Sequence, residues 1–266
     1  MSALPLVAEG LVLRVEGATL VDGVSLRLEA GELLGVVGPN GAGKTSLLRL
    51  LAGDLAPTAG RVLLGGVPLD AMRSLALARS RALLPQHTLL QFAFRALDVV
   101  LMGRYPHRES SGEQDRAVAE AAMSGTDTAH LAARFYPTLS GGEQTRVSLA
   151  RVLAQETPLI MLDEPTVSLD LRHQELVMSL LRGLVREGAG VIVVLHDLNL
   201  AARYADRVAL MSRGRLAALA PTREVLQAEL LSRVYEHPVT VVPHPALDCP
   251  LVLPLGGGAA GAPQSS

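Results

Sequence analysis

Cysteine is almost absent from this sequence of 266 residues, since Cys249 is the only one. A single thiol cannot form an internal disulfide, and there is no cysteine-rich ligand set for a metal. The sequence therefore favours a reducing, cytoplasmic compartment.

Long apolar runs are missing as well. Runs such as 159–162 and 191–195 fall far short of the roughly 20 residues that span a bilayer, and the first residues lack the basic start of a signal peptide. We therefore expect a chain that neither crosses a membrane nor is secreted.

Positive charge is also scarce: 24 Lys and Arg stand against 26 Asp and Glu, for a net charge of −2. Such a balance provides no basic field for nucleic acid, so we expect no nucleic-acid partner.

Lysine is scarce too, because Lys44 is the only lysine and the other 23 residues of the Lys and Arg total are arginine. A compact ammonium group cannot be replaced by a planar guanidinium where it must sit between phosphate oxygens. Lys44 is therefore the first residue to consider as functional.

Strand and helix patterns alternate outside a central helical stretch. Short apolar runs predict strands at 33–37, 61–64, 82–84, 159–162 and 191–195. Periodic patterns predict helices at 44–52, 171–186 and 198–204, followed by a hairpin that turns at 213–214. This alternation indicates the α/β class, with a largely parallel sheet covered on both faces.

The stretch between these two alternating parts is mostly helical, with candidate helices at 97–102, 115–123 and 146–154. We expect a core of residues 1–87 and 156–235 and an inserted helical subdomain of residues 88–155. Residues 236–266 form a carboxyl-terminal extension. Its last part, 256–266, is Gly, Ala, Ser and Pro with one Gln, and we expect it to be disordered.

A glycine-rich phosphate loop follows the strand at 33–37 and opens the helix at 44–52. Its sequence satisfies the pattern G-x-x-x-x-G-K-[ST] in the strand–turn–helix context that the pattern requires. Backbone N–H groups and the positive helix end would bind the α- and β-phosphates of ATP. Lys44 would reach the β- and γ-oxygens, and the Thr45 hydroxyl would ligate Mg²⁺. The alternative is a glycine-rich turn without a ligand. The predicted nucleotide-binding residues are Gly38, Pro39, Asn40, Gly41, Ala42, Gly43, Lys44, Thr45 and Ser46.

Two adjacent carboxylates, Asp163 and Glu164, end the apolar strand at 159–162. Packing does not explain two acids there, because desolvation opposes the ionisation of both. A divalent ion would explain them: Asp163 would hold Mg²⁺, and Glu164 would orient or deprotonate an attacking water. A solvated pair that opens a loop is the more common arrangement, and only the phosphate loop favours the catalytic one.

The segment 139–144, Leu-Ser-Gly-Gly-Glu-Gln, resembles the signature motif of ABC transporter ATPases, about 20 residues before the carboxylate strand. Ser140 and Glu143 also form a capping-box pattern at the start of a helix that runs through Arg151, and a well-capped helix is the alternative reading. The resemblance implies the ABC ATPase fold: a P-loop NTPase (RecA-like) core with a mixed or parallel sheet and an inserted helical subdomain. It also implies a homodimer, in which Ser140, Gly141 and Gly142 of one copy close over the γ-phosphate bound by the other.

Three further positions match the family in order along the chain. Gln86 resembles the glutamine loop that senses Mg²⁺ and water, Asp170 belongs to a segment like the D-loop, and His196 resembles the switch histidine. The resemblance thus implies catalytic roles for Glu164, His196, Lys44 and Gln86. The implied Mg²⁺ ligands are Thr45, Gln86 and Asp163. Val15 departs from the pattern, because it takes the place of the usual aromatic residue that stacks on adenine.

The segment 99–107 is similar to one in ATPases for iron-siderophore, haem and cobalamin uptake, and segments 130–134, 150–155 and 234–239 look most like the haem (hemin) importer branch. This likeness implies a bacterial importer subunit, peripheral on the cytoplasmic face of the inner membrane, with permease partners and, indirectly, a substrate-binding protein. Siderophore or cobalamin cargo is the alternative. A translation or DNA-repair ATPase is a further alternative, but the chain lacks a second fused domain and a coiled-coil insertion. His107, His237 and His244 are read as surface or packing residues and not as haem ligands.

Overall fold

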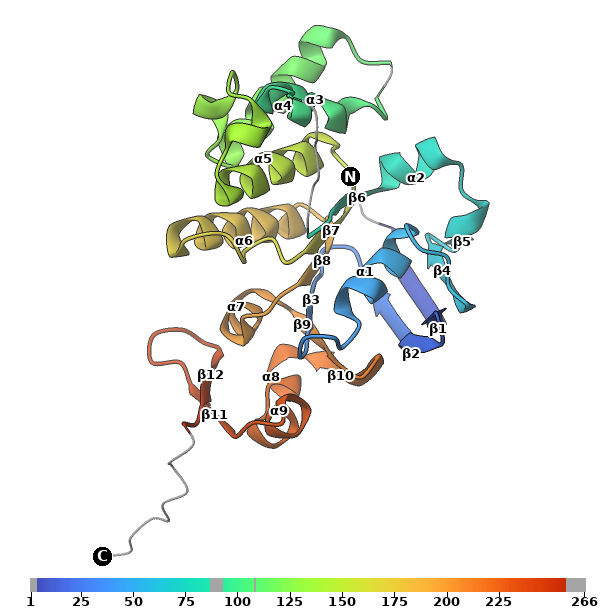
Figure 1. Cartoon of the computed structure of the whole chain (residues 1–266), viewed down its shortest axis with the longest axis vertical. Helices are drawn as coiled ribbons and strands as arrows, with labels where there is room; N and C mark the ends of the chain where they lie inside the picture. The colour runs from blue at the N-terminus through green and yellow to red at the C-terminus, as the bar shows by residue number, and fades with distance from the viewer. Residues whose placement is uncertain (1–3, 87–92, 108, 257–266) are drawn as a thin grey trace, which may run out of the picture.

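The computed structural model describes residues 4–86, 93–107 and 109–256. In this part of the chain a six-stranded sheet has the order β10-β9-β3-β8-β7-β6 (Figure 1). Its strands are parallel except β10, which pairs antiparallel with β9 at one edge. The strands are β3 (Leu33–Val37), β6 (Arg81–Leu84), β7 (Leu159–Asp163), β8 (Gly190–Val194), β9 (Arg207–Ser212) and β10 (Arg215–Pro221). The predicted parallel sheet is confirmed.

Both faces of this sheet are buried, as the sequence predicts. Alternate residues of β3 point to opposite sides, so Leu33 and Val37 belong to one hydrophobic cluster and Leu34 and Val36 to the other. The first cluster also holds apolar residues of α6 (Leu171–Arg186) and α7 (Leu198–Tyr204). The second holds those of α1 (Lys44–Ala52). Continuous burial on both faces explains why these strands read as unbroken apolar runs.

A second, antiparallel sheet completes the cluster under α1. Its order is β2-β1-β4-β5, with β1 (Leu6–Val15), β2 (Ala18–Leu28), β4 (Ala59–Leu64) and β5 (Val67–Pro68). Residues Leu6, Leu11, Val21 and Leu28 fill the cluster from this side. Only the strand at 61–64 was predicted here. The sheet brings the start of β2 beside the phosphate loop.

The central helices form a separate group at the upper end of the molecule (Figure 1). These are α3 (Ala96–Leu101), α4 (Gly112–Gly125) and α5 (Gly141–Ala154), and they share their own apolar cluster. Each overlaps a predicted helix. The predicted boundary at residue 88 lies outside the described residues. A further helix, α2 (Ser74–Ser80), precedes β6.

The carboxyl-terminal part adds α8 (Thr222–Val225), α9 (Ala228–Tyr235) and a hairpin of β11 (Val239–Pro243) and β12 (Pro250–Pro254). The sequence did not indicate this hairpin, which lies at the lower end of the molecule (Figure 1). Of the segment 256–266, predicted to be disordered, residues 257–266 lie outside the described residues. Within the described ranges, no helix has the length and apolar content needed to cross a bilayer.

Candidate nucleotide site

The phosphate loop connects β3 to α1, and two of its glycines have no room for a side chain. Gly38 has a φ of 147°, and a Cβ there would lie 2.2 Å from the carbonyl oxygen of Met211. Gly43 has a φ of 94°, and its Cβ would lie 2.3 Å from the carbonyl oxygen of Leu20. Backbone atoms of β9 and β2 thus lie against the loop on its two sides, and only glycine fits at these two positions.

Lys44 begins α1 and is 5% exposed. Its ammonium group donates to the carbonyl oxygens of Gly38 (2.9 Å) and Pro39 (3.1 Å), so it lies folded over the loop. Burial lowers the pKa of Lys44, while the nearby charges of Glu164 and Asp163 act in the opposite direction. No side chain caps the helix at Gly43. A positive side chain and an uncapped helix start together make a site suited to an anion.

Asp163 ends β7 on the other side of the loop and is 3% exposed. The Thr45 hydroxyl donates to its Oδ1 at 3.3 Å. Burial raises the pKa of Asp163, and the hydrogen bond from Thr45 partly offsets this effect. A hydroxyl beside a buried carboxylate is a ligand pair of the kind that Mg²⁺ accepts. Among the described residues no cluster of three or more His, Cys, Asp or Glu is arranged to hold a metal ion.

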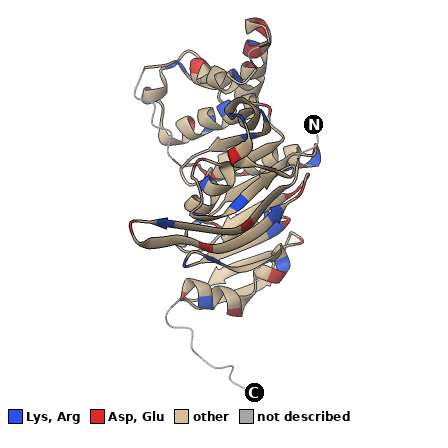
Figure 2. Ribbon diagram, turned by 90° about the vertical axis from the view of Figure 1, so that its right-hand side faces the viewer, with Lys and Arg blue, Asp and Glu red and all other residues tan. Residues whose placement is uncertain are grey.

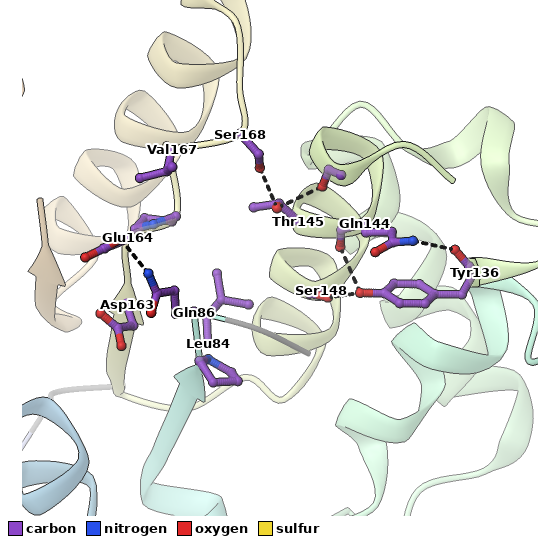
Figure 3. A pocket seen from close by; sticks show the side chains of 13 residues that line it. Leu84, Gln86, Tyr136, Gln144, Thr145, Ser148, Asp163, Glu164, Val167 and Ser168 are labelled. Carbon is purple, nitrogen blue, oxygen red and sulfur yellow. Dashed lines mark hydrogen bonds between the residues drawn. The ribbon is translucent and has the colours of Figure 1, made fainter. Parts of the chain in front are cut away.

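Glu164 contacts two of the residues that the sequence had singled out, Gln86 and His196. Figure 3 shows the contact with Gln86. Gln86 Nε2 donates to Glu164 Oε2 at 2.8 Å, and His196 Nε2 lies 2.5 Å from Glu164 Oε1. The Glu164 side chain is 7% exposed, and its backbone has a φ of 53°, a conformation uncommon for residues other than glycine. Three candidate catalytic residues, far apart in sequence, thus meet at the carboxyl ends of β6, β7 and β8.

The start of α5 is built as the capping pattern predicts. Ser140 is the N-cap: its hydroxyl accepts from the Glu143 amide at 3.4 Å, and the Glu143 carboxylate accepts from the Ser140 amide at 2.7 Å. These hydrogen bonds lower the pKa of Glu143. Thr145 also exchanges a hydrogen bond with Ser168 at 2.9 Å. The signature helix is therefore tied to the segment that precedes α6.

Asp170 is the N-cap of α6, where its carboxylate accepts from the His173 amide at 2.9 Å. The Asp170 side chain thus caps the helix that follows it in the same chain. The role expected for Asp170 across a dimer stays a prediction.

A cavity of about 360 Å³ separates the helical group from the core (Figure 3). Gly141 borders it from α5, and Gln86, Asp163 and Glu164 border it from the core. Within the described ranges, Ser140, Gly141 and Gly142 have no hydrogen bond to residues 38–46. The chain thus brings together the phosphate loop, the carboxylates, Gln86 and His196, but leaves its own signature motif across the cleft.

Tyr136 also lines this cavity, and the sequence analysis had not selected it. Its hydroxyl lies 2.8 Å from Ser148 Oγ, and burial raises the pKa of Tyr136. The position of Tyr136 shortly before the signature motif is the only sequence signal for it. Val15, the predicted departure, lies at the end of β1 and is 45% exposed.

Comparison with known proteins gives consistent matches. The model of the family described as "ABC transporter" matches residues 21–167. The chain is 52% identical to the hemin import ATP-binding protein HmuV of Nocardia farcinica, over 93% of this chain and 88% of that protein. It is 49% identical to the HmuV protein of Gloeobacter violaceus, over 94% of both chains.

Solved structures agree with this match. A transporter described as metal-chelate type, in an inward-facing conformation, has a TM-score of 0.81 and 30% identity, and the match covers 96% of this chain and 98% of that chain. The ATP-binding cassette MJ0796, a dimer bound to ADP and Pi, has a TM-score of 0.75 and 26% identity, with 82% and 99% of the two chains covered. The expected fold is confirmed. This chain belongs to the ABC transporter family and is one of its ATP-hydrolysing subunits.

Proposed function

We propose that this chain is one of two identical subunits that bind and hydrolyse Mg-ATP between them and thereby drive haem import through a separate permease. The observation that carries the proposal is the incomplete site. One chain unites a phosphate loop, two carboxylates, Gln86 and His196, but its own signature motif lies across the cleft. A second copy would supply the missing side of the site.

The residues around Asp163 fit a magnesium ion. Thr45 and Asp163 offer a hydroxyl and a carboxylate in contact, and Gln86 reaches the same group of side chains. Bound there, Mg²⁺ would neutralise charge on the β- and γ-phosphates. Residues 38–46 would hold the phosphates by backbone N–H groups, with Lys44 turning from the carbonyl oxygens of the loop to the phosphate oxygens.

Glu164 would position the attacking water and accept its proton. His196 and Gln86 fix the two carboxylate oxygens of Glu164, so the group would be oriented before ATP arrives. Lys44 and His196 would stabilise the charge that develops on the γ-phosphate. Orientation of this kind removes much of the entropic cost of reaching the transition state.

Two observations support a dimer. The helix start at Ser140 to Gly142 has no hydrogen bond to the chain's own phosphate loop among the described residues, and its positive end would favour a phosphate bound by another copy. The MJ0796 cassette, 26% identical to this chain, is dimeric with ADP and Pi bound. In the proposed cycle ATP holds two copies together, and release of its products separates them.

The cargo assignment rests on the relatives. Proteins about half identical to this chain over most of its length carry the name hemin import ATP-binding protein. We therefore place the subunit on the cytoplasmic face of the cell membrane, docked to a permease that receives haem from a substrate-binding protein. The same subunit could serve a siderophore or a corrinoid, because the permease and binding protein select the cargo.

The test is to purify the chain with the permease from its native membrane, reconstitute the assembly in vesicles and measure ATP hydrolysis with each cargo. Haem-stimulated hydrolysis with haem accumulation supports the proposal. Stimulation only by an iron-siderophore or cobalamin would keep the transporter and replace the cargo. Co-purification with ribosomes or repair proteins instead of a permease would refute transport.

The Glu164→Gln variant should still bind ATP, but its rate of ATP hydrolysis should fall by at least about 100-fold, because a neutral amide cannot accept a proton. The variant should then accumulate as an ATP-bound dimer, measurable by light scattering during size-exclusion chromatography. Lys44→Arg is the companion variant and should lose ATP affinity, since a guanidinium does not fit the ammonium position. A strictly monomeric wild type with full activity would contradict the shared site.

A further inference from the structure

The carboxyl-terminal hairpin has no role in the proposed mechanism. Its strands pair from Val239 with Pro254 to Pro243 with Pro250. An isolated two-stranded hairpin is at best marginally stable in water, so its neighbours must hold it in place. In the described part of the chain, β11 packs on α9 and β12 packs on α7.

One side chain of α7 binds β12 through two hydrogen bonds. The Val252 amide donates to Asn199 Oδ1 at 2.8 Å, and Asn199 Nδ2 donates to the Val252 carbonyl oxygen at 3.2 Å. A side-chain amide carries the same donor and acceptor as a peptide group, so Asn199 pairs with Val252 as a neighbouring strand would. Val252 is 5% exposed, and leaving its backbone groups without partners would be costly.

Asn199 lies in the first turn of α7, three residues after His196. Asp197 caps this turn, and its Oδ1 accepts from the amides of Asn199 at 2.7 Å and Leu200 at 3.3 Å. The helix has only seven residues, so its own hydrogen bonds cannot fix its position. Tertiary contacts must do so.

The last turn of α7 is fixed by α6. Arg203 donates to both oxygens of Glu175, at 2.6 and 2.8 Å, and the Tyr204 hydroxyl donates to the same carboxylate at 2.7 Å. The first turn, next to His196, packs Leu200 in the core, and its polar contact outside α7 is the pair of hydrogen bonds between Asn199 and the hairpin. The two ends of α7 are thus held by different parts of the chain.

We infer that Asn199 is a positioning residue: by binding Val252 it holds the first turn of α7, and with it the backbone of His196, where His196 meets Glu164. This inference rests on the proposed ATP hydrolysis. It gives the hairpin a function, because β12 becomes the support against which the switch histidine is aligned. The contact between His196 Nε2 and Glu164 Oε1, at 2.5 Å, is the geometry that depends on it.

The test replaces Asn199 by alanine, a stronger helix former than asparagine, so α7 should still form. Both hydrogen bonds to Val252 disappear. We expect kcat for ATP hydrolysis to fall about tenfold, with KM for ATP within about twofold of the wild type, because the phosphate loop belongs to another element. Hydrogen–deuterium exchange of residues 250–254 should become faster.

Arg223→Ala is the matched control. Arg223 holds the hairpin loop from α8, through the carbonyl oxygen of Asp248 at 2.8 Å and the Asp248 carboxylate. Neither of these contacts involves a residue of α7. Its loss should speed exchange in the loop while kcat stays at the wild-type value. Faster exchange at 250–254 with unchanged kcat in Asn199→Ala would overturn the inference, as would equal losses of kcat in both variants. A wild type that binds ATP but does not hydrolyse it would overturn the proposed function, and this inference with it.

Discussion

At the scale of single residues, the nucleotide site buries two opposite charges at the same edge of the sheet. Burial lowers the pKa of Lys44 and raises the pKa of Asp163, so in both cases the fold disfavours the charged form. Each pKa shift means that, without a ligand, the buried charge lowers the free energy of unfolding. Binding of an anion by Lys44 and of a cation by Asp163 would remove both effects. Ligand binding should therefore also stabilise the fold.

Asp163→Asn should raise the stability of the nucleotide-free protein by about 1 kcal/mol at neutral pH, because an amide keeps the Thr45 contact without a buried charge. The raised pKa of Asp163 means that the folded state binds the proton more readily than the unfolded state. The cost of the charge therefore vanishes as pH falls below the ordinary carboxylate range, and the two proteins should converge there. Urea unfolding at a series of pH values measures this. Greater stability of the wild type at neutral pH would contradict it, and Mg²⁺-dependent hydrolysis should be lost in the variant.

The sequence predicted the residues that belong to recognisable motifs, and these include Gln86 and His196, which meet Glu164 from other elements. It did not predict Asn199, which belongs to no motif. Lys44 and Thr45 lie in one loop, and Asp163 and Glu164 end one strand, so spacing alone finds them. Asn199 acts through Val252, and the two are 53 residues apart. No periodicity or motif reports such a pair, because the contact exists only once the hairpin has packed against α7.

At the scale of elements, the start of α5 is packed against the segment before α6 so closely that backbone atoms meet. A Cβ on Gly142 would lie 2.9 Å from the carbonyl oxygen of Ser168, whereas one on Gly141 would have its nearest neighbour at 4.0 Å. Two adjacent glycines of one motif thus have different reasons to be glycine. Gly142 allows close packing, and Gly141 borders the cavity.

Gly142→Ala should therefore destabilise the fold by about 1–3 kcal/mol, because the clash is with backbone and cannot be relieved by a side-chain rotation. Gly141→Ala is the matched control and should change the free energy of unfolding by less than about 1 kcal/mol, since alanine also favours the helix. Chemical denaturation of both variants measures the difference. Equal effects would show that the close approach to Ser168 does not matter for stability.

Which elements were predictable follows from their burial. The parallel strands are buried on both faces and read as apolar runs, and α6 has a clear apolar stripe ended by Gly188. By contrast, β1 and β2 alternate between buried and exposed residues and contain irregular pairing, and the sequence analysis did not select them. The strand β11 ends at a proline, and β12 begins and ends at one. Proline is tolerated at strand ends, but in a sequence it is typical of a turn or loop, so these two strands were not predicted.

At the scale of the whole molecule, the helical group and the core meet at Gln155, where α5 ends. The side-chain amide of Gln155 donates to the backbone carbonyl oxygens of Ala78 at 2.6 Å and Arg81 at 3.0 Å. The backbone carbonyl oxygen of Gln155 lies 2.8 Å from His107 Nε2. In the ribbon of Figure 2, acidic and basic residues are interspersed along the elements. The joint between the two parts therefore includes specific hydrogen bonds at Gln155.

The stability of the whole fold should fall as pH rises from about 10 to about 12. Burial raises the pKa of Tyr235 to about 12, with the backbone of Gly38 acting in the opposite direction. The unfolded chain, with an ordinary tyrosine pKa near 10, loses its proton first, so alkaline pH favours unfolding in this window. Thermal unfolding across that range should show a steeper loss of stability in the wild type than in Tyr235→Phe. Parallel profiles would contradict this account.

The single lysine gives this protein a natural reporter. A protease that cleaves only after lysine has one target in the chain, and that target lies inside the phosphate loop. Amine-reactive reagents likewise find Lys44 alone, apart from the amino terminus. Because Lys44 is only 5% exposed, a reagent reaches it when the loop opens, and a bound nucleotide should slow that reaction further. The yield of one peptide in a mass spectrum would then report nucleotide binding without any engineered label.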